Sequence, residues 1–100
     1  MEKVIARSEV IYALTNHHTE LEMLGVKSLC LFGSVARDEA TPNSDIDFIV
    51  EFEQSGGLFQ LLRLQHFLED LFQRKIDVGT EKSLREHLRI PVTKDIVHVF

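Results

Sequence analysis

The sequence has a single cysteine, Cys30, and no apolar run that approaches the length of a membrane span. One cysteine excludes a disulfide within the chain and fits a reducing compartment. A membrane-spanning helix needs about 20 consecutive apolar residues, and the N-terminus lacks the apolar stretch of a signal peptide. We therefore expect a cytoplasmic protein without a membrane segment, in which Cys30 is a small residue of the core.

Positive charge is also scarce, since 11 lysines and arginines stand against 16 aspartates and glutamates, for a formal net charge of −5. Stable nucleic-acid binding depends on lysine and arginine contacts to phosphates, so the composition argues against a stand-alone nucleic-acid-binding protein. A nucleotide substrate is not excluded, because metal ions neutralise both an acidic site and a triphosphate. An acidic protein of this size also suits a basic protein partner.

Repeats, low-complexity tracts and linkers are absent, and we expect residues 1–100 to form one domain. Apolar spacing predicts helices over residues 8–24, with a break near 16–18, and over residues 58–73. The apolar stripe of the second helix comprises Leu58, Leu61, Leu62, Leu68, Leu71 and Phe72. Strands are expected over residues 28–32, 45–52 and 74–79, a short helix from Ser83, and either a strand or a helical turn over 95–100. Interleaved helices and strands indicate an α/β (α+β) fold.

The most informative segment joins a Gly33-Ser34 turn and one helical turn to a strand that opens with Asp45 and Asp47. Alternate residues of a strand point to the same face, so the two carboxylates project together from Cα atoms about 6.5–7 Å apart. This spacing suits one Mg²⁺, or a pair of ions about 3.5–4 Å apart as in phosphoryl transfer. Backbone N–H groups of the Gly-Ser turn, at the start of a helix, suit a phosphate.

Three further positions complete the set of candidate site residues. Asp77 lies within an apolar strand, where a charge needs a partner such as a shared metal ion or a salt bridge. Arg37 follows Ser34 by one helical turn and can reach a phosphate or orient an aspartate. Ser44 directly precedes the second strand, and we expect it to brace the loop by hydrogen bonding and to assist nucleotide binding. Asp70 and Glu69, on the preceding helix, are alternative carboxylates that we expect to be solvated.

A Gly-Ser turn, a short loop, Asp-x-Asp and a later acidic strand residue together resemble the nucleotidyltransferase superfamily that includes DNA polymerase β. The resemblance covers nearly the whole chain and is greatest to the minimal nucleotidyltransferases (MNT proteins), the MntA-type antitoxins usually paired with a HEPN-domain toxin. It implies a small mixed β-sheet packed against helices. It also implies that Asp45, Asp47 and Asp77 are catalytic and bind two Mg²⁺ ions, with Asp77 able to take the proton of the attacking hydroxyl. The family often has glycine after the arginine, where this chain has Asp38.

The resemblance further implies transfer of AMP from ATP to a hydroxyl of a partner protein, with release of pyrophosphate. The implied partner is a HEPN-type ribonuclease toxin, and the chain leaves no room for a domain that would hold another acceptor. Two alternatives remain open. One is an antitoxin that neutralises its toxin by binding and occlusion, and the other is a free-standing enzyme acting on a small molecule or an RNA end. Retention of all three aspartates favours catalysis, and the acidic charge counts against RNA.

Overall fold

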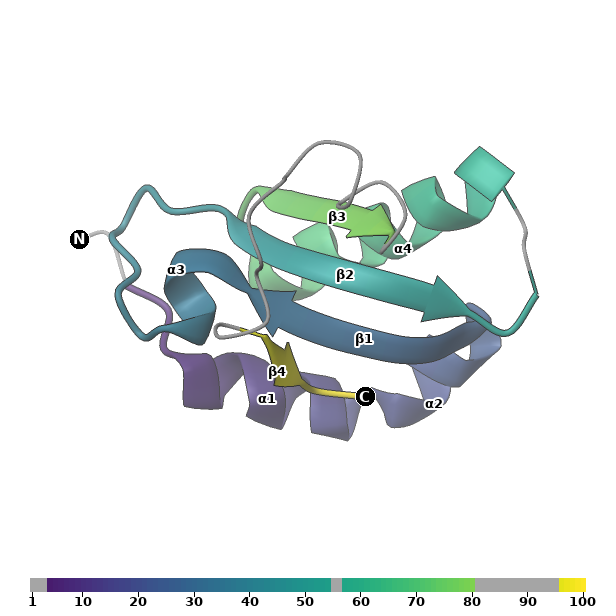
Figure 1. The fold of residues 1–100 in the computed structure, drawn as a ribbon, viewed down its shortest axis with the longest axis horizontal. Coiled ribbons are helices and arrows are strands. Elements are labelled where there is room, and N and C mark those ends of the chain that lie inside the picture. The colour runs from purple at the N-terminus through teal and green to yellow at the C-terminus, as the bar shows by residue number, and fades with distance from the viewer. Residues whose placement is uncertain (1–3, 55–56, 81–95) are drawn as a thin grey trace.

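The computed structural model describes residues 4–54, 57–80 and 96–100. The elements are helices α1 (Arg7–Asn16) and α2 (His18–Met23), strand β1 (Val26–Phe32), helix α3 (Gly33–Ala36), strand β2 (Ile46–Phe52), helix α4 (Gly57–Phe72) and strands β3 (Ile76–Thr80) and β4 (Val97–His98). The predicted α/β class and the predicted break in the first helix are confirmed (Figure 1). The tail contains a strand, and the helix expected from Ser83 lies outside the described residues.

The strands form one mixed sheet in the order β3-β2-β1-β4. β1 pairs antiparallel with both β2 and β4, whereas β2 and β3 run parallel. Parallel neighbours need a long crossover, and α4 supplies it from behind the two strands (Figure 1). Among the described residues, no helix is long and apolar enough to cross a membrane.

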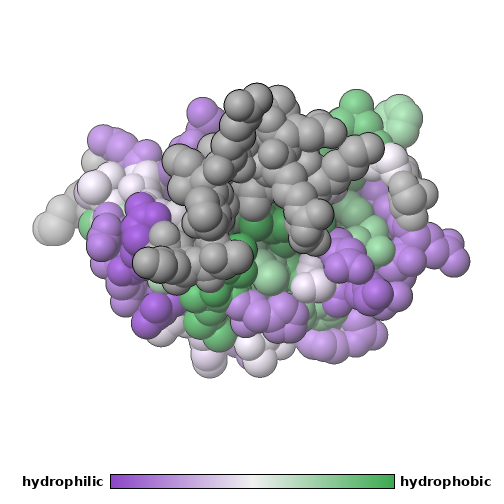
Figure 2. All heavy atoms as spheres, viewed as in Figure 1, coloured by the Kyte–Doolittle hydropathy of each residue, from purple (hydrophilic) through white to green (hydrophobic). Residues whose placement is uncertain are grey.

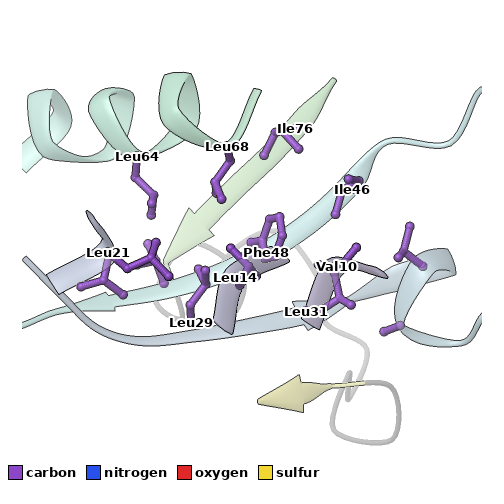
Figure 3. Packing of buried hydrophobic residues seen from close by; sticks show 14 residues of the cluster. Val10, Leu14, Leu21, Leu29, Leu31, Ile46, Phe48, Leu64, Leu68 and Ile76 are labelled. Carbon is purple, nitrogen blue, oxygen red and sulfur yellow. The ribbon is translucent and has the colours of Figure 1, made fainter. Parts of the chain in front are cut away.

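The hydrophobic core lies between one face of the sheet and the helices. In β2, Ile46, Phe48 and Val50 are at most 2% exposed, whereas the residues between them are only partly buried or exposed. This alternation means that one face of the sheet packs and the other remains available for a site. Leu64 and Leu68 point from α4 toward the strands (Figure 3). The helices contribute Val10, Leu14, Leu21, Val35, Leu64 and Leu68 to the fully buried set.

Two sequence-based predictions about the core are wrong. Leu58 and Leu62 belong to the predicted stripe of α4 but are 68% and 40% exposed, whereas Leu64, outside that stripe, is fully buried. Cys30 is only partly buried, because it lies between two buried leucines of β1 and so faces away from the core.

Candidate active site

Three aspartates come together where β2 and β3 begin. Asp47 is the register partner of Asp77 in the parallel pair, and Asp45 lies two residues before Asp47, one residue ahead of β2. Neighbouring strands are about 4.8 Å apart and side chains two residues apart share a face. The three predicted carboxylates therefore lie in one patch, on the face of the sheet opposite the core. In Figure 2 hydrophilic residues gather at the same end of the molecule, around the loop that leads into β2.

The carboxylates of this patch repel one another. The pKa of Asp47 is raised from 3.8 to about 6, first because burial disfavours its charged form and then because Asp77 and Asp45 add negative charge nearby. The positive charge of Arg37 opposes this rise but does not cancel it. The patch therefore holds more negative charge than its protein surroundings balance, which favours a bound cation.

Gly33 packs directly against Asp47. Phe32 is the register partner of Asp47 in the antiparallel pair of β1 and β2, so the chain leaves β1 beside that aspartate and enters α3. Gly33 has φ +79°, and a Cβ atom there would overlap Oδ2 of Asp47 and lie 3.3 Å from its Cγ. Glycine thus satisfies both the backbone and the space. The turn and the first N–H groups of α3, which have no partner within a helix, consequently lie beside the acidic patch.

Arg37 ends α3 one helical turn after Ser34, as the sequence predicts. Its Nε lies 3.4 Å from Oε2 of Glu39, and its charge also acts on Asp47. The next residue, Asp38, adopts φ 58°, in the left-handed region that favours glycine. Aspartate tolerates that region better than most residues, so the departure from the family's glycine leaves the turn intact.

Ser44 braces the loop before β2, and this prediction is confirmed. Its Oγ accepts a hydrogen bond of 2.8 Å from the backbone N–H of Thr41, and its own N–H donates to the Thr41 carbonyl at 3.0 Å. Arg74 tightens the loop further by donating to the carbonyls of Pro42 and Ser44, at 3.1 and 3.3 Å. A role for Ser44 in nucleotide binding stays a prediction.

Sequence reasoning overlooked Arg74 and Lys75, which directly precede β3. Lys75 Nζ lies 4.0 Å from Oδ2 of Asp45. A cavity of about 300 Å³ adjoins this pair and is lined by Pro42, Asn43, Ser44, Asp45, Gln73, Arg74 and Lys75. The signal in the sequence was that two basic residues directly precede β3, the strand that carries the third aspartate. The alternative carboxylates lie on α4, where Asp70 is exposed as expected and Glu69 is partly buried, and neither is among the groups that act on Asp47.

The donor atoms of the patch fit Mg²⁺, which prefers carboxylate oxygens. The excess negative charge around Asp47 supports the same fit. As placed, however, no group of three His, Cys, Asp or Glu side chains within the described part of the chain converges on a single ion position. Asp77 is exposed and is the register partner of Asp47, so side-chain rotation is the change that would bring these two aspartates to one ion.

The model of the nucleotidyltransferase domain family matches residues 15–98, a range that contains the Gly-Ser turn and all three aspartates. The chain therefore belongs to the nucleotidyltransferase domain family, in agreement with its fold and its acidic patch. Within that family it is a minimal nucleotidyltransferase, with a single small sheet and its covering helices.

The relatives agree with this assignment over nearly their whole length. Protein adenylyltransferase MntA of Thermococcus cleftensis is 33% identical over 97 residues, which are 96% of this chain and 98% of the relative. The solved structure of a candidate minimal nucleotidyltransferase is 29% identical, with a TM-score of 0.76 over 93% of this chain and 95% of that one.

Two more distant solved structures share the fold. A toxin-antitoxin complex with AMP-PNP contains a chain that is 19% identical, with a TM-score of 0.66 over 96% of this chain and 73% of that one. The other structure is the tri-AMPylated HEPN toxin of Shewanella oneidensis in complex with its MNT antitoxin. The matching chain of that complex is 17% identical, with a TM-score of 0.57 over 94% of this chain and 68% of that one.

Proposed function

We propose that this protein transfers AMP from ATP to a hydroxyl of a HEPN-type toxin and is the antitoxin of that pair. The observation that carries the proposal is the contact between the Gly-Ser turn and the acidic patch, because Gly33 leaves room only for the carboxylate of Asp47. A phosphate-binding turn and a cation-binding patch are thereby joined in one site. The similarity to the adenylyltransferase MntA over nearly the full length of both chains supports AMP as the transferred group.

The partner and the nucleotide are inferred from proteins of the same fold. One is an MNT antitoxin in complex with a tri-AMPylated HEPN toxin, and another belongs to a toxin-antitoxin complex with the ATP analogue AMP-PNP. The net charge of −5 suits a protein partner better than a nucleic acid.

In the proposed reaction the acceptor oxygen forms a bond to the α-phosphorus of ATP while the bond to the bridging oxygen of the β-phosphate breaks. Pyrophosphate leaves, and the proton of the acceptor hydroxyl passes to Asp77, whose exposed carboxylate lies beside Asp47. Mg²⁺ held by Asp45, Asp47 and Asp77 would neutralise phosphate charge and lower the pKa of the attacking hydroxyl. The remaining contribution of the chain is positioning of the phosphates and the acceptor.

The other site residues hold the nucleotide and the loop. We expect the N–H groups of Gly33 and Ser34, at the start of α3, to donate to the phosphates, and Arg37 to add a positive charge one turn further on. Ser44 fixes the loop that presents Asp45, through its hydrogen bonds to Thr41. Each of these residues acts already in the ground state, so their loss should raise KM, and kcat should fall only where the interaction is stronger in the transition state.

The test is AMP transfer to the purified HEPN-type partner with Mg²⁺ and α-phosphate-labelled ATP, followed by intact mass measurement. We expect whole AMP units on the partner with the wild-type protein and a loss of about a hundredfold or more in rate for Asp45→Asn and Asp47→Asn. Asp70→Asn is the matched control, since it removes an exposed aspartate outside the patch and should leave transfer unchanged.

Two outcomes would contradict the proposal. A partner that stays unmodified, and is bound equally by the wild type and both variants, would identify neutralisation by occlusion. Transfer to small hydroxyl compounds in the absence of any partner protein would identify a free-standing enzyme.

A further inference from the structure

Lys75 completes a square of four ionisable side chains on the sheet face that points away from the core. β2 and β3 run parallel with Asp47 opposite Asp77, which places Asp45 opposite Lys75 one pleat earlier on the same face. The Nζ of Lys75 lies 4.0 Å from Oδ2 of Asp45. Three corners of the square are carboxylates and the fourth is an ammonium group.

The contact between Lys75 and Asp45 does little for the stability of the fold. The two side chains are 79% and 41% exposed. Exposed ion pairs typically contribute under about 1 kcal/mol, because water screens the charges and ordering a long side chain costs entropy. The ammonium group is therefore held loosely and is easily displaced from the carboxylate.

Arg37 and Lys75 act on different aspartates of the square. Arg37 is the cation that lowers the pKa of Asp47, whereas Lys75 is not among the groups that act on that aspartate. Lys75 instead lies against Asp45. A cation that binds to Asp45 must consequently displace Lys75 or accept a positive neighbour at close range, and either requirement weakens its binding.

We propose that Lys75 competes with the divalent cation for Asp45 and thereby sets the order in which the site is loaded. The cation binds weakly on its own, and binds well together with the nucleotide, whose phosphates supply the negative charge that Lys75 removes from the patch. Lys75 is thus a determinant of cation affinity in the site. The inference rests on the metal site of the proposed function.

The experiment titrates the full chain with Mn²⁺ in the absence of nucleotide. The electron paramagnetic resonance signal of free Mn²⁺ measures how much of the ion is bound. We expect Lys75→Met to lower the dissociation constant about fivefold at low salt and Lys75→Arg to keep the wild-type value. In about 1 M salt the higher Mn²⁺ affinity of Lys75→Met should largely disappear, because the repulsion between the lysine and the ion is then screened within about 3 Å.

Lys27→Met is the matched control. Lys27 is 56% exposed and lies 3.3 Å from Glu51 outside the square, so its loss changes the net charge equally without freeing a patch carboxylate. Equal Mn²⁺ affinity of the wild type and Lys75→Met, or an equal gain in Lys27→Met, would overturn the competition while leaving the metal site in place. Absence of Mn²⁺ binding to every variant, even with AMP-PNP present, would overturn the metal site and this inference together.

Discussion

At the scale of single residues, Gly33 meets two independent requirements. Its φ of +79° is unfavourable for any residue with a side chain, and its missing Cβ leaves the space that Asp47 Oδ2 fills. Gly57 has a similar φ of +70°, but apart from its chain neighbours and its own helix no described atom lies within 4 Å of the position of a Cβ. The two glycines therefore separate the cost of the backbone conformation from the cost of displacing the carboxylate.

We predict that Gly57→Ala lowers the free energy of unfolding by about 1–2 kcal/mol, because it forces a side chain into the left-handed region, and that Gly33→Ala lowers it further because it also displaces the carboxylate of Asp47. Only Gly33→Ala should also abolish AMP transfer, because it moves the carboxylate of Asp47. Urea unfolding and transfer rates measure the two effects. Equal transfer rates for the two variants would show that the contact with Asp47 has no catalytic importance.

Asp47 gives a prediction about the pH dependence of stability in the metal-free protein. Its pKa is about 6 in the folded state and 3.8 as the reference value, so the folded state binds this proton more tightly. The free energy of unfolding therefore falls as pH rises from about 4 to about 6, and the loss is complete above pH 6. Burial and two neighbouring carboxylates are the causes, and Asp47→Asn removes all three penalties.

We accordingly expect Asp47→Asn to be more stable than the wild type at pH 7 in EDTA, by about 1 kcal/mol after allowance for solvent screening. At pH 3.5 the two proteins should have nearly equal free energies of unfolding. Urea unfolding at both pH values tests this. A variant less stable than the wild type at pH 7 would refute the assignment of excess negative charge to the patch.

At the scale of elements, Asp38 connects α1 to the turn after α3. The N-cap residue of α1 is Ala6, which makes no side-chain cap hydrogen bond. Asp38 supplies one from a distance in sequence, since its Oδ1 accepts from the N–H of Arg7 at 2.9 Å, and Arg7 in turn donates to the carbonyl of Ala36 at 3.1 Å. An aspartate at this position therefore both adopts the left-handed turn and caps a helix.

Three substitutions at Asp38 should fall in a fixed order of stability. Asp38→Asn keeps an acceptor and should lie close to the wild type, whereas Asp38→Gly keeps the turn but loses the cap, at about 1 kcal/mol. Asp38→Ala loses the cap and also places a side chain at the unfavourable φ, so its free energy of unfolding should be about 1 kcal/mol lower than that of Asp38→Gly. Thermal unfolding of the three variants measures the order. Wild-type stability of Asp38→Gly would mean that the hydrogen bond to Arg7 contributes nothing.

The order and type of the described elements were predictable from apolar spacing and turn residues, but the buried face of α4 was not. Leu58 and Leu62 lie about 80° and 120° around the helix from Leu68, at 100° per residue. Leucine and phenylalanine occur on most sides of α4, so composition cannot tell which leucines meet the sheet. The tertiary packing selects Leu64 and Leu68.

The candidate site shows the same division between local and long-range information. Asp45 and Asp47 follow from strand alternation within one segment, so the sequence predicts that they share a face. The proximity of Lys75 to Asp45 depends on the register of β2 against β3, which no local pattern specifies. Asp77 reaches the site through the same pairing and was predicted only because the chain resembles a known family, whereas Lys75 had no such signal and was missed.

At the scale of the whole molecule, the sheet separates stability from chemistry. One face packs against the helices to form the core, and the other carries the aspartates beside the Gly-Ser turn. The mixed strand order makes this possible, because antiparallel pairing of β1 with β2 brings the turn to Asp47 and parallel pairing of β2 with β3 brings Asp77 to the same point. Substitutions in the patch should therefore change binding and catalysis without unfolding the protein.

The last prediction measures this separation through the stability of the whole domain. A ligand that binds only the folded state raises the free energy of unfolding, by about 1.4 kcal/mol at tenfold excess over its dissociation constant. For a domain of this size, that corresponds to a rise in Tm of about 5–10 °C. We expect AMP-PNP with Mg²⁺ to produce this rise in the wild type and in Asp70→Asn, but at most a small one in Asp45→Asn or Asp47→Asn. Equal rises in all four proteins would show that the nucleotide binds away from the three aspartates.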